Sequence, residues 1–238
     1  MPHGGTMMRL RQLAKATRGA VTRRLVPIDA ATLTRPTPVS RCFAMDRGTP
    51  IDRYYIEKFL SRHASLIAGD VMEIGGAEYI RKFARDPRSV AVLHATSGNP
   101  QATLVADLTE PDTLPAARID CLICTQTLNF IFDVGRAIEG MAKLLRPGGV
   151  ALVTVAGISQ ISRYDMSRWG DYWRFTDAAL RRLFAAQFDA HIEIYGNVAA
   201  AVAFLQGVSV EDLPARAILD ETDPDYQLNL GVVARRLP

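Results

Sequence analysis

Apolar positions along the chain follow two alternating periods. Short, almost wholly apolar runs predict strands at residues 71–74, 89–93, 103–105, 119–124 and 150–155. Between them, apolar residues at helical spacing predict helices at 78–84 and 133–145. Strands that are apolar throughout are typical of a parallel sheet covered on both faces, and their alternation with helices predicts a doubly wound α/β fold.

The regions on either side of this alternation follow a different pattern. Asp52 is the predicted N-cap of a helix whose apolar face runs from Ile56 to Ile67. The later residues predict a helix at 176–186 with Thr176 as its N-cap, a strand at 190–195, a helix at 198–205 and a strand at 228–236. We expect the two late strands to be neighbours, with an antiparallel strand at the edge of the sheet.

Positive charge is concentrated at the start of the chain. Residues 1–28 contain six Arg or Lys and no acid, whereas the whole chain has 28 basic and 25 acidic residues. The remainder is slightly acidic, which argues against a nucleic-acid-binding domain. We therefore predict a basic N-terminal extension at 1–28 and one domain at 29–238. The extension is either a solvated leader or an amphipathic helix for an anionic membrane surface or a partner.

Cysteine and histidine usage excludes several kinds of chemistry. Three cysteines do not form a disulfide framework, which favours a reducing, cytoplasmic setting. Cys121 and Cys124 lie inside a predicted strand, where positions i and i+3 face opposite sides, so we expect them to be structural. The four histidines have no metal-ligand spacing, and no metal is expected. No apolar run approaches the ~18–20 residues that cross a bilayer.

Polar or glycine residues follow three of the predicted strands. In an open α/β sheet, ligands bind beyond the carboxyl ends of the strands. Glu73 and Gly75–Gly76 end the first strand, where glycine lets a ligand approach the backbone, although a Gly-Gly turn after a strand is more often structural. Asp107 follows the third strand and either contacts a ligand amine or caps a turn. Thr125 and Gln126 follow the fourth strand.

Taken together, these stretches resemble a class I S-adenosylmethionine (SAM) dependent methyltransferase. The resemblance rests on EIGG at 73–76, DL at 107–108 and LLRPGG at 144–149. The stretches TPIDRYYIE at 49–57 and GDYWRFT at 170–176 are similar to bacterial methyltransferases encoded beside glycosyltransferases for surface polysaccharides. The resemblance implies a mostly parallel, seven-stranded Rossmann-like sheet with an antiparallel edge strand, and SAM as the cofactor.

The resemblance also assigns cofactor contacts. It implies that the methionine end of SAM is held by Glu73, Gly75 and Gly76, and that the adenine is contacted by Asp107 and Leu108. It also implies that Thr125 and Gln126 line the sulfonium, and that Arg53 and Tyr54 close over the carboxylate of the cofactor. Two features depart from the family pattern. Ala77 and Tyr79 replace glycines, and His94 stands where an acid for the ribose hydroxyls is expected.

The predicted reaction is an in-line transfer of the activated methyl group to a hydroxyl of a glycan or glycan-lipid precursor. Such a hydroxyl needs a general base, for which the candidates are His94, Asp165 and Asp171. The predicted substrate lid, residues 158–175, supplies Tyr164, Trp169, Tyr172, Trp173 and Arg174 for sugar rings and anionic groups.

An alternative function follows from the altered glycine motif and the missing acid. The chain would then be a non-catalytic methyltransferase-like subunit that scaffolds a glycosyltransferase, with the basic extension at the inner face of the membrane. A nicotinamide dehydrogenase ranks lower, because neither a full Gly-x-Gly-x-x-Gly nor the acid about 20 residues further on is present.

Overall fold

A computed structural model describes residues 17–25 and 27–238 of the protein. The predicted basic extension is therefore covered only in part, since residues 1–16 and 26 lie outside this range. Residues 17–25 form a helix. Within the described ranges, none of the helices combines the length and the apolar character needed to cross a bilayer.

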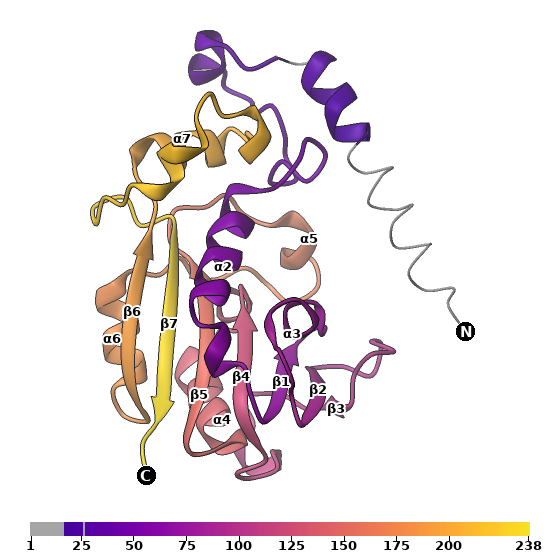
Figure 1. Ribbon diagram of the computed structural model, residues 1–238, viewed down its shortest axis with the longest axis vertical. Helices are drawn as coiled ribbons and strands as arrows, with labels where there is room; N and C mark the ends of the chain where they lie inside the picture. Colours follow the sequence, from indigo (N-terminus) through magenta and orange to yellow (C-terminus); the bar gives the residue numbers. More distant parts are fainter. Residues whose placement is uncertain (1–16, 26) are drawn as a thin grey trace. The chain divides into compact units, whose positions relative to one another are not determined.

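The core of the fold is a seven-stranded sheet with the order β3-β2-β1-β4-β5-β7-β6 (Figure 1). Its strands are β1 (Asp70–Ile74), β2 (Ser89–His94), β3 (Leu104–Val105), β4 (Ile119–Thr125), β5 (Leu145–Ala156), β6 (Phe188–Tyr195) and β7 (Asn229–Arg236). The first five strands are parallel to one another, and β7 is antiparallel to both β5 and β6. The predicted fold class is confirmed, and the antiparallel strand lies one place inside the edge strand β6.

Helices connect and cover these strands. They are α2 (Ile51–Arg62), α3 (Glu78–Phe83), α4 (Val134–Leu144), α5 (Arg163–Met166), α6 (Asp177–Phe184) and α7 (Val198–Leu205), with short 3-10 helices η1 (Ala30–Thr34), η2 (Ala64–Leu66), η3 (Pro111–Thr113), η4 (Leu128–Phe130), η5 (Val210–Asp212) and η6 (Arg216–Asp220). Thr176 is the N-cap of α6 as predicted, since its hydroxyl accepts from the Ala179 amide. The prediction for Asp52 is wrong, because α2 begins one residue before it, directly after Pro50.

Strand order indicates where a ligand is expected, at the carboxyl ends of the central strands. From β1 the chain runs outward through β2 to β3, and it then returns to the other side of β1 to form β4 and β5. The order reverses between β1 and β4, and ligands of such sheets bind beyond the carboxyl ends at this point. Leu122 and Val153 in the middle of the sheet are fully buried. Helix α4 packs closely as well, because a side chain at Gly140 would collide with the Leu108 carbonyl.

The chain divides into two compact units. The larger unit is Ile56–Tyr195 with Asn229–Pro238 and contains the sheet, and the smaller one comprises Met1–Tyr55 and Gly196–Leu228. This division differs from the boundary predicted at residues 28/29, because the described helix 17–25 belongs with both segments of the smaller unit. The boundary itself stays a prediction.

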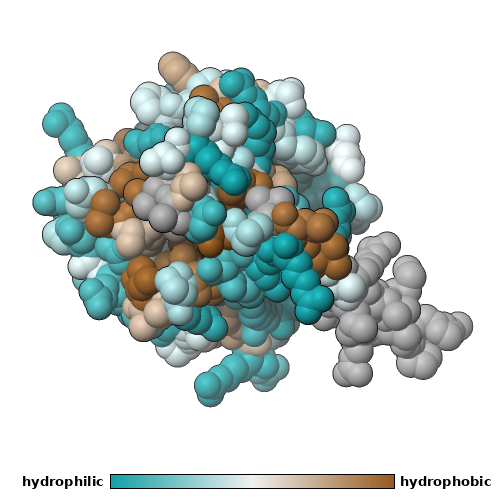
Figure 2. All heavy atoms as spheres, turned by 90° about the horizontal axis from the view of Figure 1, so that it is seen from above, coloured by the Kyte–Doolittle hydropathy of each residue, from teal (hydrophilic) through white to brown (hydrophobic). Residues whose placement is uncertain are grey.

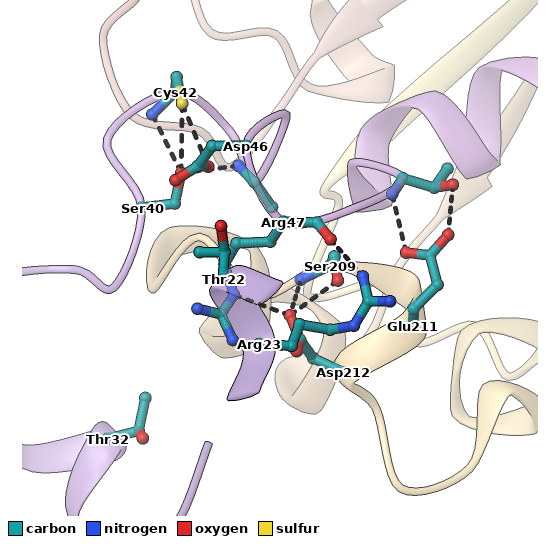
Figure 3. Close-up of polar contacts among 12 residues, drawn as sticks. Thr22, Arg23, Thr32, Ser40, Cys42, Asp46, Arg47, Ser209, Glu211 and Asp212 are labelled. Carbon is teal, nitrogen blue, oxygen red and sulfur yellow. Dashed lines mark hydrogen bonds and ion pairs between the residues drawn. The ribbon is translucent and has the colours of Figure 1, made fainter. Parts of the chain in front are cut away.

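Polar contacts join the two segments of the smaller unit (Figure 3). The fully buried guanidinium of Arg47 donates to both carboxylate oxygens of Asp212, at 2.9 and 3.0 Å. Thr49 donates to Glu211 through its amide and its hydroxyl, at 2.7 Å in each case. Arg23 of helix 17–25 donates to the Arg47 carbonyl. Segments more than 160 residues apart in the sequence therefore form one body.

Apolar side chains are also exposed on the smaller unit. Val198, Val202 and Leu205 follow one another on α7 at helical spacing and are exposed. The face of the molecule shown in Figure 2 carries several separate apolar patches between hydrophilic residues.

Candidate functional site

The corner after β1 is open at Gly75. Gly75 has a φ of +87°, and its amide donates to the Leu93 carbonyl at 2.9 Å, which holds the corner against β2. A Cβ added at Gly75 would meet no atom within 4 Å, so the backbone here faces free space. The Asn99 side chain donates to the Gly75 carbonyl at 2.7 Å. Sequence reasoning missed Asn99, which lies in a polar loop without a periodic signal.

Glu73 holds the start of α3. Its carboxylate is 3% exposed and accepts from the amides of Tyr79 at 3.0 Å and Ile80 at 2.9 Å. These amides are among the donors at a helix start that lack a partner within the helix. Burial raises the pKa of Glu73 to about 7, against the opposing effect of the two backbone donors. These bonds of Glu73 fix the loop between β1 and α3, and its predicted contact with the methionine end of SAM stays a prediction.

The residues that replace family glycines pack inside the fold. Tyr79 is buried, and its ring stacks on Phe83 with the centroids 6.2 Å apart. Ala77 and Gly76 are buried as well. A carboxylate oxygen of Glu78 lies 2.0 Å from where a Cβ of Gly76 would stand.

Asp107 lies at the carboxyl end of β3 and is exposed. Its Oδ1 accepts from the Thr109 amide and from the Thr109 hydroxyl, each at 2.8 Å. Asp107 therefore caps this turn through Oδ1. Its predicted contact with a ligand amine stays a prediction, since these two bonds leave the other carboxylate oxygen, Oδ2, unused. Leu108 is buried in the hydrophobic core, and its carbonyl lies against Gly140 of α4. Its predicted contact with the adenine stays a prediction.

The end of β4 carries a strained backbone. Gln126 has a φ of +49°, which residues other than glycine adopt rarely. Its amide donates to the Thr154 carbonyl at 2.8 Å, and its side chain approaches Asn229 of β7 at 3.5 Å. Such strain is concentrated at functional sites. Thr125 precedes it as the last residue of β4 and is partly exposed.

The end of β2 carries an aromatic pair. The Nδ1 atom of His94 lies 2.8 Å from the Thr96 carbonyl oxygen. The His94 ring also meets the indole of Trp169 edge to face, with the centroids 5.7 Å apart and an angle of 76° between the planes. Trp169 belongs to the predicted lid, so a lid residue reaches the end of β2.

Asn129 joins the loop after β4 to the lid. This buried side chain donates to the Trp173 carbonyl at 2.9 Å and accepts from the Ala156 amide at 3.3 Å. Its backbone carbonyl accepts from the Tyr172 amide at 2.9 Å. Sequence reasoning missed Asn129. The available signal was a polar amide placed directly between the apolar residues Leu128 and Phe130.

Arg174 and Asp171 are paired inside the lid. The guanidinium donates to both carboxylate oxygens, at 2.6 and 3.0 Å, and to the carbonyls of Ser159 and Gln160. Burial opposes ionisation of Asp171, but Arg174 and the Ser162 amide outweigh it and lower its pKa. Both side chains are thus engaged in holding the lid. The catalytic prediction for Asp171 and the substrate prediction for Arg174 have no support in these contacts.

In the same segment, Asp165 bonds to Ser162, the N-cap of α5. Its Oδ2 accepts from the Ser162 hydroxyl at 2.5 Å, and the Ser162 oxygen in turn accepts from the Asp165 amide. Tyr164 lies one residue earlier, is exposed, and stacks under the Arg168 guanidinium at 3.5 Å.

Three aromatic rings form an exposed cluster next to the end of β4. Phe132 is 69% exposed, and Tyr172 is 50% exposed. The Phe132 ring lies 5.4 Å from that of Tyr172 and 5.9 Å from that of Trp173. The Trp173 indole donates to the Ile131 and Phe132 carbonyls, at 3.1 and 3.2 Å, which fixes its plane. We call Phe132, Tyr172 and Trp173 the aromatic cluster.

The remaining predictions concern two residues of the smaller unit, two cysteines of β4 and metal binding. Arg53 and Tyr54 belong to the smaller unit, where the Tyr54 hydroxyl donates to Asp220 at 2.8 Å; their cofactor role stays a prediction. Cys121 and Cys124 are buried free thiols, and burial raises the pKa of each to about 12. Within the described residues, no group of three His, Cys, Asp or Glu side chains is arranged to hold a metal ion.

Comparison with protein families and curated proteins gives one match. Residues 65–153 match the family described as a methyltransferase domain. This stretch includes the glycine corner, His94, Asp107 and Gln126. A search of curated proteins gives no match to the chain.

Solved structures support the fold. A SAM-dependent methyltransferase from Archaeoglobus fulgidus has a TM-score of 0.50 at 9% identity, covering 77% of this chain and 94% of that one. The N-methyltransferase NodS from Bradyrhizobium japonicum, in complex with S-adenosyl-L-homocysteine (SAH), has a TM-score of 0.50 at 16% identity, covering 94% and 99%. The [4+2]-cyclase SpnF gives the same TM-score and identity, covering 94% and 96%. A cyclase among these structures shows that the fold alone does not define the reaction.

Proposed function

We propose that this SAM-dependent methyltransferase, assigned by its matched domain and its fold, O-methylates a glycan or a glycan-lipid precursor. The aromatic cluster is the observation that carries the acceptor class. Large exposed apolar groups mark a binding surface, and flat rings next to polar loops suit the faces of sugar rings. The resemblance to methyltransferases of polysaccharide biosynthesis supports the same class.

The residues at the strand ends fit the cofactor. Gly75 leaves open space where a side chain would otherwise stand, so the methionine end of SAM has room beside the corner. Asp107 is exposed and keeps Oδ2 outside its turn contacts, which suits an adenine amine. Thr125 and Gln126 lie at the end of β4, on the other side of β1. When bound, SAM supplies a methyl group that its sulfonium has already activated.

The chain then has to position the acceptor and exclude water. Holding the hydroxyl in line with the methyl carbon converts a bimolecular reaction into an effectively unimolecular one. We propose that the lid performs this task, because Asn129 ties it to β4 and the Arg174–Asp171 pair keeps it folded. Asp165 is the general base that we retain, since Asp171 is saturated by Arg174.

The order of the strands argues against His94 as the base. β2 and β4 flank β1 on opposite sides, and neighbouring strands lie about 4.8 Å apart. His94 is therefore about 10 Å from the end of β4, on the side of the cofactor that faces β3. It is better placed to contact the cofactor than the acceptor hydroxyl.

The test is methyl transfer to defined acceptors. The full-length protein is incubated with SAM and a panel of lipid-linked and nucleotide-linked sugars, and SAH release is measured together with methyl gain by mass spectrometry. Stable methylation of a sugar hydroxyl supports the proposal. Methylation of amines alone, as the name N-methyltransferase describes for NodS, would overturn the O-methylation. D165N should lower kcat without changing the affinity for SAH if Asp165 is the base.

The alternative of a non-catalytic subunit that scaffolds a glycosyltransferase rests on Ala77 and Tyr79. Both are buried where the family has glycines, and the acid expected for the ribose hydroxyls is missing. Calorimetry separates the two functions, because the scaffold predicts no heat with millimolar SAM. Contact of the basic extension with a membrane or a glycosyltransferase belongs to the same alternative; co-sedimentation with anionic vesicles tests the first.

A further inference from the structure

We propose that Trp169, together with His94, forms an aromatic wall of the cofactor site on its ribose side. The inference deepens the proposed function and rests on it. The observation that carries it is the edge-to-face contact between the two rings, which lie 75 residues apart in the sequence and meet at the carboxyl end of β2. Sequence reasoning had given Trp169 to the acceptor.

The position of His94 along the edge of the sheet supports this assignment. The glycine corner is bonded to Leu93, the residue directly before His94. On the other side, His94 pairs in register with Val105, two residues before Asp107. His94 therefore lies between Gly75 and Asp107. A cofactor with its amino-acid end at the corner and its adenine at Asp107 has to pass His94 with the sugar between them.

Trp169 reaches this point from a well-folded turn. The amides of Arg168 and Trp169 donate to the Asp165 carbonyl, at 2.9 and 2.8 Å. Gly170 then turns the chain at a φ of +90°, and the Tyr172 ring fills the space where its side chain would stand. Figure 1 shows α5, which precedes this turn, beyond the arrowhead of β4. The indole is 39% exposed, so one part of it contacts His94 and another part stays accessible.

The His94–Trp169 pair would bind the ribose differently from the carboxylate that is expected at this position. A carboxylate accepts two hydrogen bonds from a ribose diol, whereas an imidazole with Nδ1 engaged by Thr96 contributes Nε2 alone. The apolar indole face covers the sugar and excludes water, which compensates for the lost acceptor. The wall also links the two ligands, because the lid that supplies Trp169 carries Tyr172 and Trp173 of the aromatic cluster.

The experiment measures SAH binding to the full-length protein by calorimetry and by tryptophan fluorescence. W169A should weaken SAH binding about tenfold, which corresponds to about 1.4 kcal/mol, and W169F should retain most of the affinity. Trp169 and Trp173 are the only tryptophans of the chain. W173F should therefore keep the fluorescence change on SAH addition, and W169F should lose it.

A double-variant cycle completes the test. H94A should weaken binding as well, and H94A/W169A should cost less than the two single effects together, because touching residues are not additive. Unchanged SAH affinity in W169A, or a fluorescence response that survives in W169F, would overturn the wall while leaving the methyltransferase in place. Absence of SAH binding by the wild-type protein would instead refute the proposed function.

Discussion

Replacement of Glu73 by glutamine should change how the stability of the protein depends on pH. The carboxyl group titrates near 4.5 in the unfolded chain, whereas burial beside α3 raises its pKa to about 7 in the folded protein. Between these values the folded state binds a proton that the unfolded state has lost. The free energy of unfolding therefore falls as the pH rises through this window and is level above it.

The magnitude follows from the size of the shift. Each pKa unit corresponds to about 1.4 kcal/mol, so moving from 4.5 to about 7 removes about 3 kcal/mol from the wild-type protein. E73Q has the same shape, keeps one oxygen to accept from the Tyr79 or Ile80 amide, and does not titrate. Its free energy of unfolding should lose this component of the pH dependence.

Urea unfolding measured at pH 4.5, 6 and 8 gives the required comparison. The difference in unfolding free energy between E73Q and the wild type should shift in favour of E73Q by about 3 kcal/mol across this range. E110Q is a matched control, since it removes an exposed carboxylate, and it should follow the wild type. If the free energy of unfolding depended on pH in the same way for E73Q and the wild type, ionisation of the buried Glu73 carboxylate would not destabilise the folded protein. That result would refute the reasoning.

Three further variants test other parts of the structure. D107A should weaken SAH binding about tenfold by calorimetry without changing the midpoint of urea unfolding; equal affinity would remove Asp107 from the adenine site. N129A should cost about 2 kcal/mol and speed proteolysis within residues 158–175, because it removes the side chain that bonds the Trp173 carbonyl in the lid and the Ala156 amide at the end of β5. D212A should lower the unfolding free energy by about 3–5 kcal/mol by removing the carboxylate that accepts two bonds from the buried Arg47 guanidinium, and a change below 1 kcal/mol would contradict this.

The sheet was predictable from the sequence because its signals are local. A parallel strand buried on both faces needs an apolar run, and β1, β2, β4 and β5 all show one. The Thr176 cap is equally local, since its oxygen bonds an amide three residues away. The β3 strand was found although only Leu104–Val105 pair with β2.

The roles of the polar residues were harder to predict because they depend on distant partners. Arg47 and Asp212 pair across 165 positions, and nothing near either residue indicates the other. Glu73 stands at a strand end that suggests a ligand, yet its bonds go to α3. The Arg174–Asp171 pair was accessible from the sequence, because an acid three residues before an arginine is a local signal, and the substrate role of Arg174 stays a prediction.

The position of β7 has a consequence for synthesis of the protein. This strand bonds to β5 on one side and to β6 on the other, but it leaves the ribosome after both of them. Until it arrives, two strands present unpaired backbone donors and acceptors, which are templates for association with another nascent chain. Completion of the sheet is thus a late event in biogenesis, and the interval before it is when chaperones would matter most for this protein.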